Sequence, residues 1–367
     1  MPAILNASRA WEPRTLLLLG SAASGEVHGR RSGGIWELYS DLDLGLFVAT
    51  VPPVDGRAQL RHALDQALAG IWASLGLRPN PLDVGVFHLG SLGAMPCTIE
   101  LAAAAAEPCA LWGDPALVAQ ALGPYDAPYE ALRLVLNRVN ETLLPAGEPA
   151  RLLPGVGGAR DWPERPERGD WQAAHRWSKL PLDAVKAWGI ARGAPAPIAA
   201  LPGARAVWQS WGAWRQEPTW PPPPRAEAET SAAIGALLER LGEQLLDRPW
   251  AWVEPSDWLA LLRREAGTAR ARWRRWRRLL ANAPPELSRL RLMRWGWQHR
   301  AVWPASLVAL ITAGASLDIV RGERGAQWTR VLARRWPVCH DLESREWDAA
   351  WVAALERGLA WVRRCGA

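Results

Sequence analysis

The sequence predicts an α+β protein in which a small mixed sheet fills the N-terminal third and a mostly α-helical region follows. Apolar runs of strand length occur at 14–19, 39–48 and 82–89, and a helical pattern at 57–75 lies between the last two. Beyond residue 125 the strand signals fade, and apolar residues recur at helical spacing to the end of the chain. These observations separate an N-terminal sheet region from a helical remainder.

Length and composition indicate a protein with more than one packed domain. The chain has 367 residues, of which 49% are hydrophobic and 22% charged, and this suffices for two or three cores. No apolar run is long enough to cross a bilayer, and the first residues lack the basic leader and cleavage site of a signal peptide. We therefore expect a cytoplasmic protein with no membrane partner.

The four cysteines form neither a C-x-x-C pair nor a cluster with histidines. A structural zinc site and a disulfide framework are therefore not expected. These cysteines are Cys97, Cys109, Cys339 and Cys365.

Basic residues outnumber acidic ones. The net charge of +6 and the pI near 9.7 suit a polyanionic partner, which includes both nucleoside triphosphates and nucleic acid. Of the 43 Lys and Arg residues, Lys179 and Lys186 are the two lysines. They stand seven residues apart, so they would share one face of a helix.

The first strand, 14–19, ends at Gly20 and Ser21. The residues after them can begin a short helix, whose free backbone N–H groups would bind phosphate oxygens. The alternative is an ordinary turn from strand to helix, in which the same residue types occur. Within the following interval, Arg30 and Arg31 are expected to be solvated, with a phosphate contact from one of them as the alternative.

Two aspartates one residue apart follow Ser40 at the mouth of the strand 39–48. Because side chains alternate along a strand, Asp41 and Asp43 would project from the same face, where two anions repel each other. A divalent cation between them would relieve the repulsion.

A third aspartate, Asp83, lies near the start of the strand 82–89 on an otherwise apolar background. The intervening helix implies a crossover that brings this strand beside the strand of Asp41 and Asp43. Asp83 would then complete one carboxylate cluster. His28 and His88 lie near this cluster and are expected to be structural.

The remainder of the chain reads as helices and loops. A helix at 171–191 contains both lysines, and Pro181 would kink it or mark a second start. Four consecutive prolines end the segment 214–224, the clearest linker in the chain. Further helices are expected at 129–144, 227–246, 255–280, 285–299, 304–313, 326–336 and 344–364.

An Arg-rich run with interleaved Trp residues spans 272–278. Such a run can bind nucleic acid by charge and stacking. On a helix, however, Trp273, Trp276 and Leu280 fall on one stripe, which we expect to be buried with the arginines in solvent.

The order of these motifs resembles the nucleotidyltransferases of the polymerase-beta type. The resemblance rests on Gly20-Ser21, Ser40-Asp41-Leu42-Asp43, a crossover helix, and Asp83 on the next strand. The chain is most similar to minimal nucleotidyltransferases and to bacterial enzymes that adenylylate small molecules such as aminoglycosides. The resemblance covers about the first 120 residues. It departs from the family in the long interval before Asp41, which an insertion at 29–39 would explain.

The resemblance implies a site and a reaction. Asp41 and Asp43 would hold Mg²⁺ against the triphosphate of a nucleotide, and a second Mg²⁺ would be shared with Asp83. Asp83 would also accept the proton of the acceptor hydroxyl or position a water that does, and Glu100 is the alternative general base. Gly20, Ser21 and Ser40 would contact the nucleotide, as would Lys179, with Lys186 second. The candidate site residues are therefore Asp41, Asp43, Asp83, Gly20, Ser21, Ser40, Lys179 and Lys186.

The implied reaction transfers a nucleoside monophosphate to a hydroxyl group of a small molecule or protein and releases pyrophosphate. The donor would be ATP and the transferred group AMP. The expected domains are a nucleotidyltransferase domain at 1–122, a helical domain that closes over the nucleotide at 123–215, a Pro-rich linker at 216–228, and a C-terminal helical domain at 229–367.

Two other functions stay open from the sequence. An inactive nucleotidyltransferase fold would serve as an RNA- or protein-binding module, and an enzyme of this fold would act on tRNA ends. The Arg/Trp run favours a nucleic-acid partner slightly, but the chain has no recognisable RNA-binding motif, so nucleic acid is not the favoured partner. The acceptor itself is not marked in the sequence.

Overall fold

The computed structural model describes residues 2–23, 28–53, 56–74, 82–95, 97–146, 162–192, 204–224, 227–249 and 255–262, together with residues 273 and 277. Four expected helices, at 285–299, 304–313, 326–336 and 344–364, lie outside these residues, as does most of the one at 255–280. The chain divides into two compact units. The first is Met1–Glu130 with Ala213–Pro222, and the second is Ala131–Gly212 with Pro223–Ala367.

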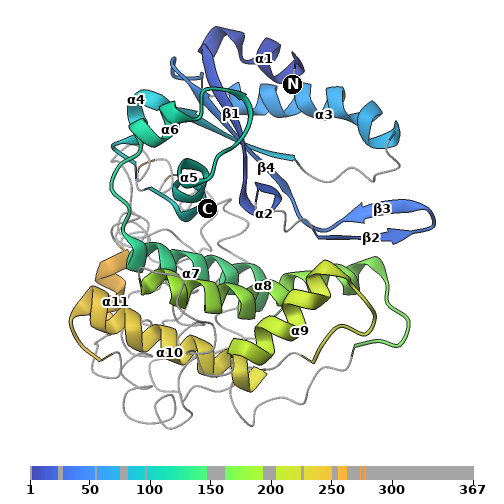
Figure 1. Ribbon diagram of the computed structural model, residues 1–367, viewed down its shortest axis with the longest axis vertical. Helices are drawn as coiled ribbons and strands as arrows, with labels where there is room; N and C mark the ends of the chain where they lie inside the picture. Colours follow the sequence, from blue (N-terminus) through green and yellow to red (C-terminus); the bar gives the residue numbers. More distant parts are fainter. Residues whose placement is uncertain are drawn as a thin grey trace. The chain divides into compact units, whose positions relative to one another are not determined.

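The first unit is built on a four-stranded mixed sheet with the strand order β5-β4-β1-β6 (Figure 1). Strand β1 (Pro13–Leu19) pairs antiparallel with β4 (Leu42–Val48) and with β6 (Cys109–Gly113). Strand β5 (Leu82–His88) pairs parallel with β4 after the crossover helix α3 (Gly56–Ser74). The mixed sheet in the N-terminal part was predicted, and it is confirmed.

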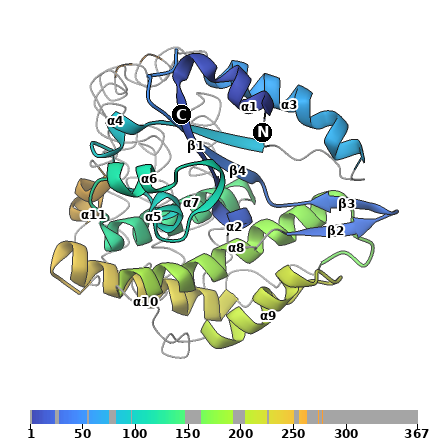
Figure 2. The same cartoon turned by 45° about the horizontal axis from the view of Figure 1, so that its top comes forward.

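Helices cover both faces of this sheet (Figure 2). Helix α1 (Pro2–Ala7) and α3 pack on one face, and α4 (Leu89–Leu92), α5 (Ile99–Ala106) and α6 (Ala116–Ala121) pack on the other. A short 3₁₀ helix, η1 (Arg9–Trp11), leads into β1. Alternation of side chains along the strands supplies both cores. The strand residues of the α1 and α3 core are Leu16, Leu44, Leu46, Val48, Leu82 and Val86.

The expected insertion at 29–39 forms a separate β-hairpin after the short helix α2 (Gly20–Ala23). Its strands are β2 (Gly29–Ser32) and β3 (Ile35–Leu38). The two residues between them, Gly33 and Gly34, have φ angles of +58° and +82°. A two-residue hairpin turn with positive φ at both positions matches the twist of the strands, and glycine adopts it without strain.

The strand expected at 39–48 starts later than predicted, at Leu42. The backbone N–H groups of Tyr39 and Ser40 both donate to the carbonyl of His28, at 2.7 and 3.2 Å. Because these groups bond to the preceding loop, the chain joins the sheet only after Asp41. Asp41 therefore precedes β4, whereas Asp43 lies within it.

The second unit is helical within its described residues. Helix α7 (Ala127–Ala146) enters it from the first unit, and α8 (Arg168–Ala191), α10 (Glu227–Leu246) and α11 (Pro255–Leu262) follow. Helix α8 runs unbroken through Pro181, so the expected second start does not occur. Helix α9 (Ala204–Gln216) leads back to the first unit.

Residues 213–222, part of the segment expected to act as a linker, belong to the first unit. The side chain of Trp214 is 4% exposed, and its indole Nε1 donates to the carbonyl of Thr219 at 2.8 Å. This hydrogen bond closes the turn after α9. The buried indole of Trp214 thus packs this segment into the first unit.

The Arg/Trp run 272–278 is described at Trp273 and Arg277. Trp273 is 50% exposed, so the expectation that it belongs to a buried stripe is wrong for this residue. Trp276 and Leu280 lie outside the described residues. In the parts of the chain that are described, no helix combines the length and the apolar character that crossing a membrane requires.

Two glycines with positive φ allow a matched test of the sheet. A Cβ on Gly113 (φ +81°) would lie 2.1 Å from the backbone oxygen of Arg14, whereas a Cβ on Gly33 (φ +58°) would meet nothing within 4 Å. Gly33→Ala should lower the free energy of unfolding by about 1 to 2 kcal/mol, the penalty for a left-handed alanine. Gly113→Ala should lower it by roughly a further 1 to 3 kcal/mol, because the backbone of β1 must move.

Urea unfolding of the full chain, followed by far-UV circular dichroism, measures both variants. Equal losses in Gly113→Ala and Gly33→Ala would contradict the close packing of β6 on β1.

Candidate active site

Two of the three candidate aspartates lie side by side in the sheet. Asp43 on β4 is the register partner of Asp83 on the neighbouring parallel strand β5. Residues in register on adjacent strands project from the same face, and the strands are about 4.8 Å apart. Asp43 is half-buried and Asp83 is exposed. The structure thus brings two carboxylates together where both strands begin.

The two strands carry the same local pattern, Leu-Asp-x-Gly-x-Phe, in register throughout. The rings of Phe47 and Phe87 stack with their centroids 5.1 Å apart. A Cβ on Gly45 would lie 2.9 Å from the Phe47 ring, and one on Gly85 would lie 2.6 Å from the Phe87 ring. Each ring therefore lies over the glycine two residues before it. The two rings form an apolar surface on the face of the sheet that carries the aspartates. This repeat is visible in the sequence and predicts the register directly, although the strands were predicted without it.

Gly20 closes the site on the side of β1. Leu19 is the register partner of Asp43, and Gly20 follows it with a φ of +60°. A Cβ at this position would lie 2.6 Å from Oδ2 of Asp43. Glycine adopts this backbone conformation without strain, and a larger residue here would require the carboxylate of Asp43 to move. Ser21, the next residue, lies in the first turn of α2 and is partly buried.

Asp41 and Ser40 lie in the segment between the hairpin and β4. The hydroxyl of Ser40 accepts a hydrogen bond from the backbone N–H of His28 at 2.9 Å, and Ser40 is 2% exposed. In this structure its hydroxyl fastens the start of β4 to the preceding loop. Asp41 is exposed. Because only one residue separates Asp41 from Asp43, Asp41 lies at the edge of the pair that Asp43 forms with Asp83.

The donor set suits a hard cation. Among the described residues, no group of three or more Asp, Glu, His or Cys side chains could hold a metal ion, so Asp41, Asp43 and Asp83 do not form a closed cage. Mg²⁺ is commonly bound by one or two carboxylates, several waters and the phosphates of a substrate. Asp43 and Asp83 match this requirement in number and in donor type.

An aromatic cluster supports the segment that carries Ser40 and Asp41. The ring of His28, which is fully buried, lies 5.5 Å from the ring of Tyr39 and 5.0 Å from the ring of Trp214. Trp214 comes from the distant segment 213–222. This contact explains why that segment belongs to the first unit, and it accords with the expected structural role of His28.

A buried ion pair lies at the root of the hairpin. Glu37 is 3% exposed, and its Oε2 lies 3.1 Å from both Nε and an NH2 group of Arg30. The hydroxyl of Tyr39 donates to the same oxygen at 3.4 Å. Burial raises the pKa of Tyr39 to about 12, although Arg30 opposes the rise and Glu37 reinforces it. Arg30 therefore neutralises Glu37 in this structure.

His88 ties the ends of β4 and β5 together. Its Nε2 lies 2.9 Å from the carbonyl oxygen of Ala49, and its Nδ1 lies 2.7 Å from the hydroxyl of Ser91. A carbonyl can only accept, so Nε2 carries the proton and Ser91 donates to Nδ1. Glu100, the alternative base, is exposed on α5.

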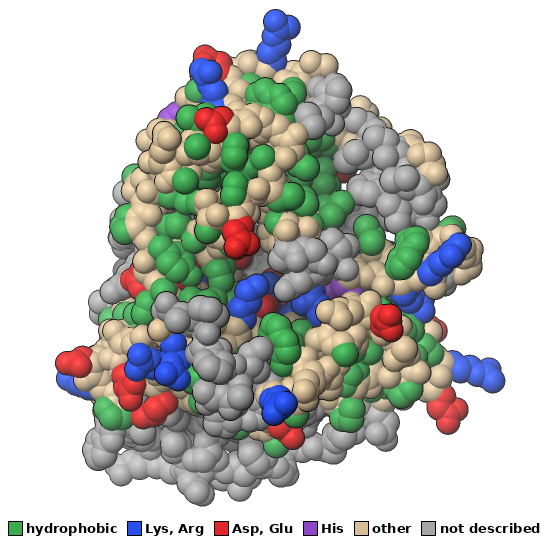
Figure 3. Space-filling view, viewed as in Figure 1, with side chains coloured by type: hydrophobic (Ala, Val, Ile, Leu, Met, Phe, Trp, Pro, Cys, Tyr) green, Lys and Arg blue, Asp and Glu red, His purple; other side chains and the backbone are tan. Residues whose placement is uncertain are grey.

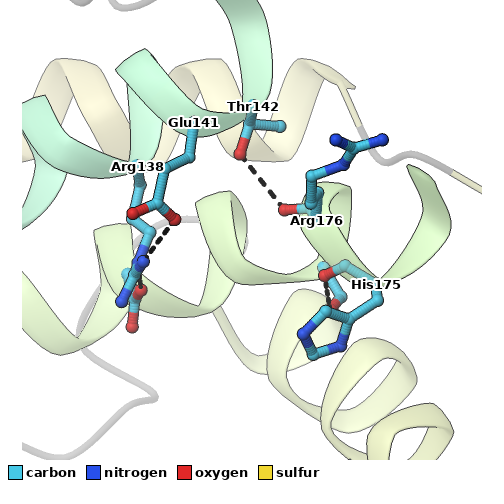
Figure 4. Close-up of polar contacts among 7 residues, drawn as sticks. Arg138, Glu141, Thr142, His175 and Arg176 are labelled. Atoms are coloured by element: carbon cyan, nitrogen blue, oxygen red, sulfur yellow. Dashed lines mark hydrogen bonds and ion pairs between the residues drawn. The ribbon is translucent and has the colours of Figure 1, made fainter. Parts of the chain in front are cut away.

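The two lysines lie in the second unit, on the less buried stripe of α8. Lys179 is partly buried and Lys186 is exposed. Between them, Asp183 pairs with Arg138 of α7, which also pairs with Glu141 (Figure 4). Burial would lower the pKa of Arg138, but the two carboxylates outweigh it and raise the pKa. The negative charge of Asp183 is thus already compensated within the unit.

The packing of α7 on α8 holds this stripe in place. The hydroxyl of Thr142 on α7 donates to the carbonyl of Arg176 on α8 at 3.1 Å (Figure 4). The face of α8 opposite the lysines is buried. Its lysine face therefore has a fixed orientation in the second unit.

Comparison with protein-family models, with curated proteins and with solved structures finds no match for this chain. The candidate site is therefore defined by its own geometry. That geometry joins Asp43, Asp83 and Gly20 in the first unit and places Asp41 and Ser40 at their edge.

The buried phenol of Tyr39 makes the stability of the first unit depend on alkaline pH. Its pKa is about 12 in the folded chain against an ordinary value of 10. The stability that it contributes is complete below pH 10 and is lost as the pH rises through 12, because the unfolded chain ionises first. Tyr39→Phe should flatten the fall in unfolding free energy between pH 10 and 12.

Urea unfolding at a series of pH values measures this slope for the wild-type chain and for the variant. Burial likewise raises the pKa of Tyr125 to about 12, so Tyr125→Phe should flatten the same fall, and the double variant Tyr39→Phe, Tyr125→Phe should flatten it further than either single variant. Parallel curves for the wild type and Tyr39→Phe would show that Tyr39 ionises equally in both states.

Proposed function

We propose that this chain is a metal-dependent nucleotidyltransferase that transfers a nucleoside monophosphate, AMP from ATP, to a hydroxyl group of a small molecule or protein. Pyrophosphate is the other product. The observation that carries the proposal is the pairing of Asp43 with Asp83 on adjacent parallel strands, with Gly20 packed against the carboxylate of Asp43. Carboxylates in this position suit a cation bound to a triphosphate.

The aspartates have separate tasks in this proposal. Asp43 and Asp83 would hold Mg²⁺, and Asp41 would add a carboxylate from the segment before β4, which allows a second ion. Bound Mg²⁺ would offset the charge of the phosphates and lower the pKa of the acceptor hydroxyl. Asp83, the more exposed member of the pair, would take the proton of that hydroxyl.

The bonds that change are those of an in-line displacement. The hydroxyl oxygen of the acceptor forms a bond to the α phosphorus of the nucleotide, and the bond from that phosphorus to pyrophosphate breaks. The proton passes to Asp83. Gly20 lets the carboxylate of Asp43 lie against the backbone at the start of α2, since a side chain there would collide with Asp43, and its backbone would contact the phosphate chain.

Serines and lysines would complete the nucleotide contacts. Ser21 would donate to the β or γ phosphate from the first turn of α2, and Ser40 would keep Asp41 in place through its bond to His28. Lys179 and Lys186 share a stripe of α8 on which the one acid between them, Asp183, is paired with Arg138. This leaves a net positive face, which suits phosphate.

Asparagine substitutions test the aspartate pair. Asp43→Asn and Asp83→Asn should each lower nucleotidyl transfer at least about a hundredfold, since each removes a carboxylate ligand and the second also removes the base. Each labelled nucleoside triphosphate is incubated with the chain, Mg²⁺ and a cell extract, and mass spectrometry identifies the product. Asp65→Asn, an exposed aspartate on α3 of the same unit, is the matched control and should retain activity.

Unchanged transfer in both variants would overturn the assignment of these residues. If the wild-type chain transfers no label from any of the triphosphates, it is a binding module with this fold and the proposed activity is wrong.

A further inference from the structure

The β2–β3 hairpin presents an exposed arginine beside an exposed tryptophan. Arg31 and Trp36 are register partners across the hairpin, so their side chains project from the same face with Cβ atoms about 5 Å apart. Trp36 is 47% exposed, and Arg31 is exposed as well. Basic and hydrophobic side chains lie together over this hairpin in the space-filling view (Figure 3).

The two arginines of β2 differ in their surroundings. Arg30 faces the other side of the hairpin and pairs with the buried carboxylate of Glu37. For Arg31, no ion pair with an acidic side chain occurs among the residues that the structure describes. Arg31 therefore keeps its charge available on the face that it shares with Trp36.

The root of the hairpin is rigid, and this fixes the position of the exposed pair. Glu37 and Tyr39 are buried there, and the carbonyl of His28 accepts the N–H groups of Tyr39 and Ser40. The hairpin therefore has a packed base and an exposed end. Trp36 stands five residues before Asp41, so an extended chain could place it at most about 17 Å from the edge of the candidate site.

We propose that the Arg31 and Trp36 face of the hairpin binds single-stranded nucleic acid. A base would stack on the indole of Trp36, and a neighbouring phosphate would contact the guanidinium of Arg31. Flat aromatic platforms with a basic neighbour are the means by which proteins bind single strands, because every base has a π face. The net charge of +6 supports the same partner.

A free small molecule fits this surface poorly. Small-molecule sites are concave and bury most of their ligand, whereas Trp36 lies on the outer face of a two-stranded hairpin. A polymer gains affinity from several such weak contacts along its length. The exposed pair therefore favours a nucleic-acid strand over a single nucleotide.

The test measures binding of a fluorescein-labelled ten-nucleotide oligoadenylate RNA by fluorescence anisotropy, with its DNA counterpart as a second probe. Low salt, EDTA and the absence of nucleoside triphosphate separate binding from the proposed transfer reaction. Trp36→Ala should raise the Kd roughly five- to a hundredfold, and Trp36→Phe should restore most of the affinity. Arg31→Gln should raise the Kd and reduce the dependence of log Kd on log salt by about 0.7.

The double variant Arg205→Gln, Trp208→Ala is the matched control. It removes an exposed arginine and an exposed tryptophan from α9, and it should leave the Kd unchanged. Asp43→Asn should also bind normally, so loss of the proposed activity and loss of strand binding are distinguishable. Circular dichroism confirms that each variant folds.

Four results would overturn the inference. They are no binding of either probe by the wild type at low salt, an unchanged Kd in both hairpin variants, an equal loss in the α9 control, and competition by AMP as effective as that by the unlabelled oligonucleotide. The last result would assign the hairpin to a free nucleotide.

Discussion

The parallel register of β4 and β5 is the constraint on which the candidate site depends. Asp43 faces Asp83 only if the two strands are aligned residue for residue. A slip by one residue would turn one carboxylate to the opposite face of the sheet, together with every apolar side chain of its strand. The stacked rings of Phe47 and Phe87, each over its own glycine, oppose such a slip. The same contacts that fix the core thus fix the carboxylates.

A second constraint determines where β4 begins. The carbonyl of His28 takes the N–H groups that would otherwise extend the strand to Tyr39, and Trp214 packs on the His28 ring. Asp41 consequently lies outside the sheet while Asp43 lies within it. The segment that carries Trp214 is more than 170 residues distant in the sequence, so a long-range aromatic contact bears on the local geometry of the site.

Much of the sheet could be predicted from the sequence, and the reasons for the failures are physical. Apolar runs and a crossover helix were enough to predict β1, β4 and β5 and the neighbourhood of Asp43 and Asp83. Strand β6 was not predicted, because its pairing with β1 depends on residues far away in the chain. For the interval 29–34 the sequence left a flexible excursion and a hairpin open, since Arg30 breaks the apolar pattern; in the structure it forms a hairpin, and Arg30 gains stability as an ion pair with Glu37. Local sequence patterns also cannot predict the contact between the rings of Trp214 and His28, because the two residues are far apart in the chain.

The aspartate pair is difficult to explain by folding alone. Like charges directly opposite each other on neighbouring strands destabilise a sheet, by up to about 1 kcal/mol. An alanine or serine at position 83 would extend β5 equally well and remove the repulsion from Asp43. Gly20 allows the carboxylate of Asp43 to lie close to the backbone, because glycine adopts the positive φ at this position without strain and has no Cβ to collide with Oδ2 of Asp43. A bound cation would remove the repulsion between Asp43 and Asp83, and this is the role proposed for Mg²⁺ at the pair.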